Sequence, residues 1–596
     1  MSDRRPDFAA LAPAVFIALF VGLGLQLDSY PQYVVAVATI SMLVGIALVV
    51  LVGLGRCISL ASGSIMAVGA YVSTLAVADL HFPYLATLGL ALAAGGVAGW
   101  VIAFPGTRFR GHNLAMVTLV FQSVWIILIR QSTWLTGGAE GIHVPPPQLF
   151  GLTITTDRSF LILIGAAAAA ITLVIAILVR GPFGKNLQAA AGNEIAAEAF
   201  GVSVRGYLTA AFVVSSMAIA FAGALLAPRI RILDPDSFGV LESIFMLAYP
   251  IAGGMHSIWG GLLGGGSLRI LPELLRPVAD YQELFFATLV ILVVMFFPGG
   301  LTELIRRAAA SLVKQDHPGG VTPARRKPAL PAVAAKAGKR ADMLRVEAVD
   351  KHFDALHAVN AASLSVPVGG IHGLIGPNGA GKTSLFNIIS GFLNADSGRV
   401  VFAGMSLLEL RARDRISLGI TRTFQNVAIF GQLSCLDNVI IGLGRNAVTQ
   451  AVVTSLDHFA GGPATHGAKR RAQAVLESVG LDGQAHSRGG SLSLGDQRRL
   501  ELARAIVSEP RLILLDEPVS GVAESEAEDL RELLIRINAE RGIAMLVVEH
   551  NIPFVAKLCQ SMSVMGAGRI IAEGRPEEVI SLPIVRQLYF GEETVA

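Results

Sequence analysis

Long apolar segments dominate the first half of the chain. Runs that are long enough to cross the roughly 30 Å apolar layer of a bilayer as helices occupy residues 9–27, 33–54, 58–78, 84–104, 114–131, 160–179, 207–228 and 284–298. A further apolar region, 238–275, is interrupted by Pro250, Gly253 and Gly254 and predicts two shorter helices. The pattern therefore predicts a polytopic, all-α transmembrane domain of about ten helices.

The basic residues between these segments predict a cytoplasmic N-terminus. With that orientation, Arg56, Arg180 and Lys185 fall on the cytoplasmic side, where Lys and Arg are normally enriched. Arg229 and Arg231 fall on the opposite side and disagree with the rule. A cleaved signal peptide is the alternative for the first segment. A retained helix is favoured because no small-x-small cleavage pattern follows and further spans come at once.

Composition separates this half from the rest of the chain. Only 15% of the 596 residues are charged, and the mean hydropathy is +0.60. Residues 1–305 hold 14 Lys or Arg and 15 Asp or Glu, whereas residues 341–596 hold 24 and 28. This composition excludes a disordered chain and a wholly soluble enzyme. Cys57, Cys435 and Cys559 lie far apart and imply neither a disulfide framework nor a zinc finger. A net charge of +3 indicates no nucleic-acid partner.

A basic stretch joins the two halves. Residues 306–340 contain nine Lys or Arg and one acidic residue, Asp316, among many alanines and prolines. Such a stretch is typical of a flexible cytoplasmic linker, which either rests on anionic lipid head groups or is only solvated. We therefore predict three parts, which are a transmembrane domain at 1–305, a linker at 306–342 and a soluble domain at 343–596.

The soluble part contains a phosphate-binding loop in the expected strand–loop–helix setting. An apolar strand at 371–375 leads into the sequence G-P-N-G-A-G-K-T and then into a helical run at 384–390. Glycines let backbone N–H groups surround phosphate oxygens, Lys382 offers a point charge to the β- and γ-phosphates, and the Thr383 hydroxyl can bind Mg²⁺. The predicted ATP-binding residues of this loop are Gly376, Pro377, Asn378, Gly379, Ala380, Gly381, Lys382, Thr383 and Ser384.

A second apolar strand, at 512–515, ends in two acids. Asp516 is placed to hold the Mg²⁺ shell, and Glu517 is placed to polarise an attacking water as the catalytic base. These motifs predict an α/β P-loop ATPase domain with ATP and Mg²⁺ as cofactors.

Between the two strands lies a motif that identifies a family. The run L-S-L-G-D-Q at 492–497 resembles the signature of ATP-binding cassette (ABC) ATPases, with Leu494 and Asp496 as departures. The resemblance implies that Phe353 stacks on adenine, that Gln425 contacts ATP and Mg²⁺ as the Q-loop glutamine, and that His550 is the catalytic switch histidine. The signature residues, which would contact ATP across a dimer, are Ser493, Leu494, Gly495, Asp496 and Gln497.

Further stretches are similar to one branch of this family. Residues 428–434, an extra segment to about 467, and 571–579 resemble the ATPase subunit of branched-chain amino acid importers. Residues 135–142, 182–184, 194–201, 234–238, 257–260 and 271–275 resemble the matching permease. Two usually separate subunits thus look fused. The likeness implies a coupling segment that includes Lys185, Glu194, Glu198 and Gly201. The D-loop at 519–524 departs from the family by lacking its Asn and Pro.

The resemblance implies ATP-driven import of branched-chain amino acids or related carboxylates and amides across the bacterial inner membrane, with the ATPase in the cytoplasm. Expected partners are the lipid bilayer, a second permease and a second ATPase subunit in a heteromer, and a periplasmic solute-binding protein, with no nucleic acid. Two alternatives stay open. One is a homodimeric half-transporter or exporter. The other is a membrane-tethered ATPase with a mechanical or signalling role.

Overall fold

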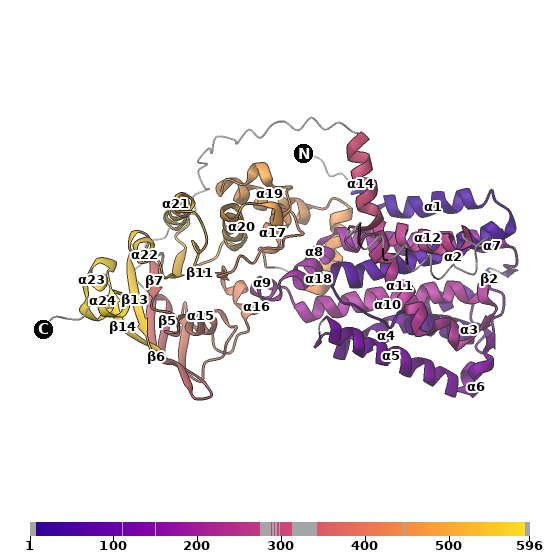
Figure 1. Cartoon of the computed structure of the whole chain (residues 1–596), viewed down its shortest axis with the longest axis horizontal. Coiled ribbons are helices and arrows are strands. Elements are labelled where there is room, and N and C mark those ends of the chain that lie inside the picture. Colours follow the sequence, from indigo (N-terminus) through magenta and orange to yellow (C-terminus); the bar gives the residue numbers. More distant parts are fainter. Residues whose placement is uncertain are drawn as a thin grey trace. The chain divides into compact units, whose positions relative to one another are not determined.

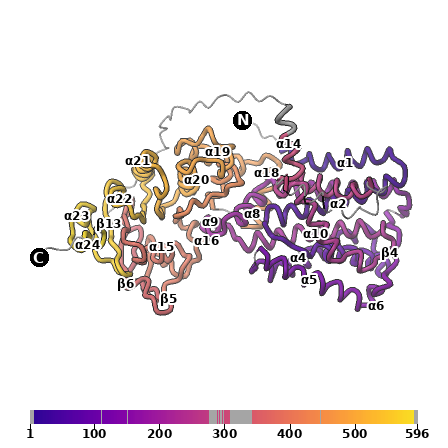
Figure 2. Tube along the Cα trace, in the orientation of Figure 1, coloured from indigo at the N-terminus to yellow at the C-terminus, as the bar shows by residue number. Residues whose placement is uncertain are grey.

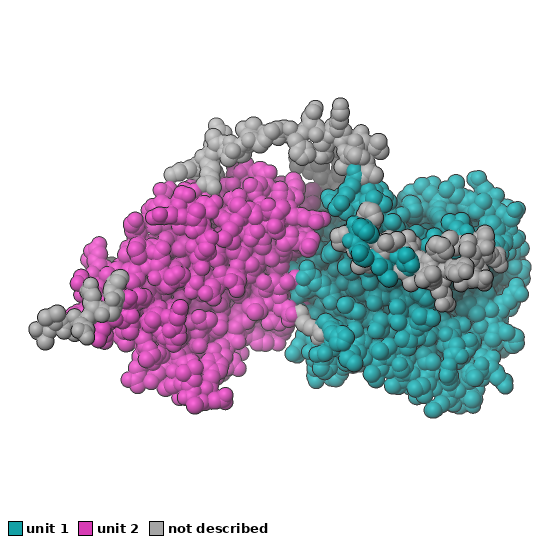
Figure 3. All heavy atoms as spheres, viewed as in Figure 1, with its two compact units in different colours: residues 1–191, 204–321, 448–463 teal, residues 192–203, 322–447, 464–596 magenta. Residues whose placement is uncertain are grey.

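The computed structural model describes residues 7–109, 111–149, 151–274, 299–312, 342–444 and 447–590, with the isolated positions 288, 291, 295 and 296. The chain forms two compact units whose sequences interleave (Figure 3). Unit 1 comprises residues 1–191, 204–321 and 448–463, and unit 2 comprises 192–203, 322–447 and 464–596. Each unit therefore contains a short piece from the other half of the sequence.

Unit 1 is a bundle of helices, several of which run side by side along one direction (Figure 1). Its main helices are α1 (Ala12–Gly24), α2 (Ser29–Leu48), α3 (Ser62–Ala78), α4 (Tyr84–Gly106), α5 (His112–Gln131), α7 (Asp157–Arg180), α8 (Pro182–Gly192), α10 (Val204–Ile230), α11 (Val240–Gly253) and α12 (Ile258–Leu274). Five helices in the described residues are long and apolar enough to cross a bilayer: Ser29–Leu54, Tyr84–Gly106, His112–Gln131, Asp157–Arg180 and Val204–Ile230. These helices confirm the predicted all-α membrane domain.

Helix α2 lies at the centre of unit 1. It continues into a π-helical stretch at Val49–Leu54, and nearly all of its residues from Val35 onward are buried. It packs against α7, α10, α11 and α12. A side chain at Gly45 would overlap the carbonyl oxygen of Gly261, so the backbones of α2 and α12 are in direct contact. Small residues permit this approach, which is how membrane helices gain packing energy without a hydrophobic driving force.

The predicted interruption of the region 238–275 is present, since α11 ends at Gly253 and α12 begins at Ile258. The expected helix 58–78 is shorter than predicted, because residues 55–61 are not helical and α3 begins at Ser62. The expected helix at 284–298 lies outside the described residues. Helix α14 (Gly300–Leu312) extends into the predicted linker, because Glu303 forms ion pairs with Arg306 and Arg307 one turn further on. Residues 313–341 of that linker also lie outside the described residues.

The structure shows the surroundings of Arg229, one of the two arginines that disagree with the charge rule. Its guanidinium lies 2.9 Å from a carboxylate oxygen of Asp157 and stacks over the rings of Tyr33 and Phe160. Pairing and stacking lower the cost of placing this charge at the end of a membrane helix. The orientation rule counts Lys and Arg and not net charge, so Arg229 and Arg231 still disagree with it. Sequence reasoning also missed two short antiparallel strand pairs near this end, β1 (Ile142–His143) with β4 (Ile232–Leu233) and β2 (Gln148–Leu149) with β3 (Leu152–Thr153).

Unit 2 is built on two sheets. A six-stranded sheet has the order β10–β11–β12–β7–β13–β14, with bounds Ile420–Arg422, Leu512–Asp516, Ala544–Val548, Ile371–Ile375, Ser561–Gly566 and Arg569–Gly574. Its first five strands are parallel and β14 is antiparallel. A four-stranded antiparallel sheet has the order β6–β5–β8–β9, with bounds Leu356–Pro367, Asp342–Phe353, Ser397–Phe402 and Met405–Ser406. This arrangement confirms the predicted α/β domain.

Helices cover both faces of the parallel sheet, so its central strands are buried throughout and read as unbroken apolar runs. On one face, Ile513 and Leu515 pack with α20 (Leu494–Ile506) and α21 (Glu524–Arg541). On the other face, Leu512 and Leu514 pack with α15 (Lys382–Ser390) and the antiparallel sheet. The remaining described helices of unit 2 are α9 (Glu194–Ala199), α16 (Ala412–Arg415), α17 (Cys435–Ile441), α19 (Pro463–Ser478), α22 (Ile552–Leu558), α23 (Pro576–Ser581) and α24 (Pro583–Phe590).

Candidate nucleotide-binding site

Four parallel strands of unit 2 end at one edge of the sheet and bring the predicted ATP-site residues together there. The phosphate-binding loop follows β7, Gln425 follows β10, Asp516 ends β11, and His550 lies two residues beyond β12. The register pairs Asp516 with Val548, so the ends of β11 and β12 are level. Open α/β sheets bind ligands at the carboxyl ends of their strands. The structure thus gathers residues that are spread over 175 positions of the sequence, from 376 to 550.

The phosphate-binding loop has the backbone conformation that its glycines permit. Gly379 and Gly381 have φ angles of 81° and 98°, and a side chain at Gly381 would overlap the carbonyl oxygen of Ala358. The loop ends at the N-terminus of α15, whose free N–H groups favour an anion. Loop and helix therefore form a cradle for phosphate oxygens.

Lys382 lies inside this cradle. Its ammonium group donates to the carbonyl oxygens of Gly376, at 2.6 Å, and of Pro377, at 2.9 Å. Burial lowers the pKa of Lys382, while the negative charges of Glu517 and Asp516 oppose that shift. A phosphate group would replace the two carbonyl oxygens as a stronger, charged partner of the ammonium group.

The two acids after β11 differ in environment. Asp516 is buried, and its Oδ2 accepts a hydrogen bond of 2.8 Å from Arg422. Burial raises the pKa of Asp516, whereas Arg422 opposes the rise. Glu517 has a φ of +44°, and its Oε2 accepts a 3.0 Å hydrogen bond from the Gln425 side chain. His550 Nδ1 lies 3.8 Å from the same carboxylate. The predicted base thus lies between the predicted Q-loop and switch residues.

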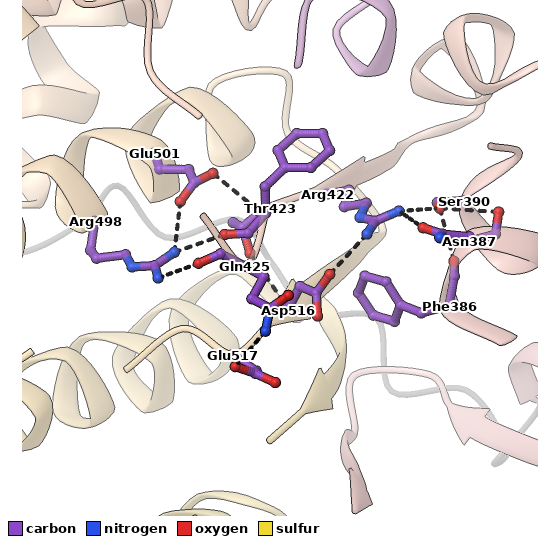
Figure 4. A network of polar contacts seen from close by, with 11 residues as sticks. Phe386, Asn387, Ser390, Arg422, Thr423, Gln425, Arg498, Glu501, Asp516 and Glu517 are labelled. Carbon is purple, nitrogen blue, oxygen red and sulfur yellow. Dashed lines mark hydrogen bonds and ion pairs between the residues drawn. The ribbon is translucent and has the colours of Figure 1, made fainter. Parts of the chain in front are cut away.

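Arg422 was missed by sequence reasoning, although it comes directly before the Thr-Phe-Gln run that identifies the Q-loop. Figure 4 shows its guanidinium between Asp516 and helix α15. Besides Asp516, it donates to Asn387 Oδ1 and Ser390 Oγ, each at 2.7 Å. Three aromatic rings surround it, those of Phe386, Phe392 and Phe424. Arg422 therefore links Asp516, the predicted Mg²⁺ ligand, to the helix of the phosphate-binding loop.

A second buried ion pair fixes the start of the Q-loop. Arg498, on α20, donates to the carbonyl oxygens of Phe424 at 2.8 Å and Gln425 at 2.6 Å. Glu501, one turn further along α20, pairs with Arg498 at 3.3 Å and accepts from the Phe424 N–H. Burial raises the pKa of Glu501, and Arg504 and Arg498 oppose the rise. The backbone of the Q-loop is thus held by the helix that begins in the signature motif (Figure 4).

The signature residues form the N-terminus of α20. Ser493 is the N-cap, and its hydroxyl accepts from the Asp496 N–H at 3.2 Å, while the Gln497 side chain donates to the Leu492 carbonyl. Leu494 is 41% exposed, and a side chain at Gly495 would overlap the Glu526 carboxylate. The motif is therefore a capped helix end that can face a phosphate, and its departures from the family pattern leave the cap intact.

Phe353, the predicted adenine platform, lies at the end of β5. Its side chain is 45% exposed, and the Lys351 ammonium lies 5.7 Å from the ring centroid. An exposed ring beside a cation has a free face for a base.

The D-loop, whose sequence departs from the family pattern, is held by a backbone contact. The Val519 N–H donates to Glu549 at 3.2 Å, and Gly521 has a φ of +75°.

The predicted coupling segment is divided between the units. Lys185 lies on α8 in unit 1, whereas Glu194 and Glu198 lie on α9, and Gly201 follows with a φ of +79°, in unit 2. Helix α9 contacts α16 (Figure 2). Arg413, on α16, donates to the Ser203 hydroxyl at 3.2 Å.

The residue that anchors this segment is Phe200, which sequence reasoning did not single out. It is fully buried, and the guanidinium of Arg504 lies 4.5 Å from its ring centroid and 4.7 Å from that of Phe430. Arg504 also donates to the Ala428 carbonyl at 2.7 Å. Residues just after the Q-loop and on the signature helix thus hold the segment directly.

The chemistry of the site fits Mg²⁺. This ion prefers oxygen ligands and keeps several waters, so one carboxylate, one hydroxyl and substrate phosphates suffice. Asp516 would supply the carboxylate, Thr383 the hydroxyl and Gln425 an amide oxygen. Among the described residues, no group of three or more His, Cys, Asp or Glu side chains forms a separate metal site.

Together, the cradle, the acids and the signature helix define an ABC-type ATPase attached to a helical membrane domain. Comparison with known proteins agrees in both parts. Residues 30–297 match the family described as the branched-chain amino acid transport system permease component, and residues 359–520 match the ABC transporter family. The chain belongs to the ABC transporters and joins these two components in one polypeptide.

The curated relatives match the second part. The chain is 32% identical over 250 residues to the high-affinity branched-chain amino acid transport ATP-binding protein BraF of Pseudomonas aeruginosa. It is 34% identical over 255 residues to a probable branched-chain amino acid transport ATP-binding protein LivG of Methanocaldococcus jannaschii. Each match covers 42% of this chain and 98% of the relative. A crystal structure of a nucleotide-free ATP-binding cassette from an ABC transporter is 32% identical, with 42% of this chain and all of that chain covered and a TM-score of 0.38.

Proposed function

We propose that the chain is a fused permease–ATPase subunit that drives import of a small solute, branched-chain amino acids or related carboxylates and amides, across the bacterial inner membrane. The observation that carries the proposal is the presence of both family matches, 30–297 and 359–520, in one chain. The curated relatives of the ATPase part are named for branched-chain amino acid transport, which supports this solute class.

The residues at the sheet edge would divide the work of ATP hydrolysis. The loop 376–384 and Lys382 would hold the phosphates, and Phe353 would stack on adenine. Thr383, Gln425 and Asp516 would bind Mg²⁺, which neutralises charge on the β- and γ-phosphates. Glu517 would polarise the attacking water, and the adjacent His550 would donate a hydrogen bond to the γ-phosphate. The Gln425–Glu517 hydrogen bond of 3.0 Å supports this division, because it joins the Q-loop to the base directly.

The effect of ATP binding and hydrolysis would be transmitted to the coupling segment through the Q-loop and α20. Arg498 holds the Q-loop backbone, and Arg504, less than two turns further along α20, holds Phe200 of the coupling segment. A movement of α20 on ATP binding would therefore shift both the Q-loop residue Gln425 and the segment 194–201. This arrangement gives a physical route by which ATP binding would alternate inward and outward access.

The proposed complex has further members. In cassette ATPases the loop of one domain and the signature of another enclose ATP, so Ser493, Leu494, Gly495, Asp496 and Gln497 would serve a partner's site. We propose a second permease, a second ATPase and a periplasmic solute-binding protein as partners in a heteromer.

Affinity purification of the full chain from its host membranes tests the assembly. The proposal expects a second permease and a second ATPase subunit in equal amounts, and ATP hydrolysis that rises when a loaded binding protein is added. A particle that contains only copies of this chain would instead support a homodimeric transporter. Loss of stimulated hydrolysis in Glu517→Gln, with unchanged assembly, separates catalysis from assembly.

A further inference from the structure

A helix from the cassette part of the sequence belongs to the membrane unit. Helix α18 (Val448–Phe459) lies between α17 and α19 of unit 2 in sequence, yet residues 448–463 are part of unit 1. The chain therefore leaves unit 2 after residue 447 and returns to it at residue 464. Within unit 1, α18 packs against α7 and α10.

The contact is centred on the elbow between α7 and α8. Ser455 is fully buried, and its hydroxyl accepts a 3.3 Å hydrogen bond from the backbone N–H of Phe183. Ala451, one turn earlier on the same face, is also buried. A side chain at Gly181 would overlap the backbone and side chain of Ser455. The backbones of the elbow and of α18 thus touch, and only glycine at 181 leaves room for this contact.

A second contact holds the end of α18. The backbone N–H of Asp7 donates to the carbonyl oxygen of Phe459 at 3.0 Å, which satisfies one of the free carbonyls at the helix C-terminus. The Asp7 carboxylate in turn pairs with Arg180 at 3.0 Å, at the end of α7. Burial favours the neutral carboxyl, but the hydrogen bond and charge of Arg180 and the charge of His458 outweigh it and lower the pKa of Asp7.

We propose that residues 448–463 form a docking helix by which the cassette sequence binds the membrane unit of its own chain. In this docking contact, Ala451 and Ser455 of α18 pack on the elbow 181–183, and Phe459 contacts the N-terminal segment at Asp7. The contact is therefore intramolecular. It keeps the cassette with this permease and not with a second permease in the same complex, independently of the covalent linker.

Cleaving the linker tests this docking contact. A protease site is inserted between residues 325 and 335 of the full chain, and the purified, cleaved protein is passed over a resin that binds a tag on the N-terminal fragment. Wild-type protein retains the C-terminal fragment. Gly181→Val, whose backbone angles of φ −79° and ψ −175° suit valine, releases it at least tenfold faster. The matched control is Gly192→Ala in the same region, because a side chain there meets open space.

Disulfide trapping gives a second measurement that does not depend on Gly181→Val folding. The pair Asp7→Cys and Phe459→Cys joins the two fragments after cleavage into one band on a non-reducing gel. The pair Asp7→Cys and Val453→Cys does not, because Val453 is 66% exposed on another face of α18. The three native cysteines are buried, so they compete little for disulfide formation under native conditions.

Two results overturn the proposal. Equal retention of the C-terminal fragment by Gly181→Val and Gly192→Ala, together with no trapping of the 7/459 pair, shows that α18 does not dock. Trapping that links two full-length chains before cleavage shows that α18 binds a second copy and not its own membrane unit.

Discussion

The buried pair between Arg422 and Asp516 gives the most quantitative prediction. The two side chains are 8% and 7% exposed and lie 2.8 Å apart, and Arg422 also bonds Asn387 and Ser390. Replacing Arg422 with methionine leaves a buried carboxylate without its partner, which costs about 3–5 kcal/mol. In a domain of 150–250 residues, each kcal/mol lowers the melting temperature by about 2–4 °C. We therefore expect the melting temperature of unit 2 to be about 6–20 °C lower in Arg422→Met than in the wild type.

The loss depends on the carboxylate that remains. When Asp516 is also replaced by asparagine, no charge is left unpaired, and a buried pair exchanged for neutral groups of similar size is often close to neutral in stability. The double variant should therefore be more stable than Arg422→Met alone. The difference in stability between the single and the double variant measures the interaction between Arg422 and Asp516. The effects of the two substitutions do not add, because both residues lie in one network.

Thiol labelling during heating measures unfolding of unit 2 selectively. A Cys57→Ser background leaves Cys435 and Cys559, both buried in unit 2. Tryptophan fluorescence serves as the internal control, since all four tryptophans, Trp100, Trp125, Trp134 and Trp259, lie in unit 1 and should report an unchanged transition. The reasoning is refuted if Arg422→Met and wild type expose the two thiols at the same temperature, or if the double variant is less stable than the single one.

Three further predictions concern the same unit. Glu517→Gln should bind ATP as tightly as wild type, measured with a fluorescent ATP analogue, but hydrolyse it at least about 100-fold more slowly, because the base is lost while the cradle stays; equal turnover would contradict this role. Lys382→Ala should weaken ATP binding by about tenfold or more, since a charge-assisted bond to phosphate is removed; unchanged affinity would place the phosphates elsewhere. His372 is buried in β7 between the hydroxyls of Ser561 and Ser563, and burial lowers its pKa to about 4. The unfolded chain therefore binds this proton more readily, so unit 2 should lose up to about 3 kcal/mol of stability as pH falls from 6.5 toward 4. His372→Gln should flatten that part of the profile in denaturant titrations, and an unchanged slope would exclude His372 as its cause.

The candidate ATP-site residues could be picked out from the sequence because local backbone chemistry dictates their positions. The loop around Gly381 needs a conformation that disfavours side chains, and Asp516 must follow a buried strand to reach the same edge. Such requirements leave a short, ordered pattern in the sequence. The same motifs and the apolar strands at 371–375 and 512–515 predicted the α/β fold of the unit, but not its strand order.

The residues that were missed act through long-range contacts. Arg422 gains its role from Asn387 and Asp516, which lie 35 and 94 positions away. Phe200 gains its role from Arg504, on a helix of the other half of the sequence. No periodicity marks such pairs, because each partner alone looks like an ordinary core or surface residue.

The division of the chain shows the same limit. Composition separates an apolar half from a soluble half. It cannot show that residues 192–203 belong to unit 2 and residues 448–463 to unit 1. Likewise, the charge rule cannot show that Arg229 pairs with Asp157, which lies 72 positions earlier. Contacts across the fold therefore decide which charges and segments matter.

Solute uptake driven by ATP tests the central proposal most directly. The complex is purified through this chain, reconstituted in proteoliposomes with ATP on the side of the cassette, and supplied on the opposite side with its binding protein and radiolabelled leucine, isoleucine or valine. We predict accumulation that requires ATP and is abolished by Glu517→Gln, while Gly22→Ala, whose side chain would meet open space, transports normally. Equal accumulation by Glu517→Gln, or ATP-driven movement of the solute in the opposite direction, would contradict the account.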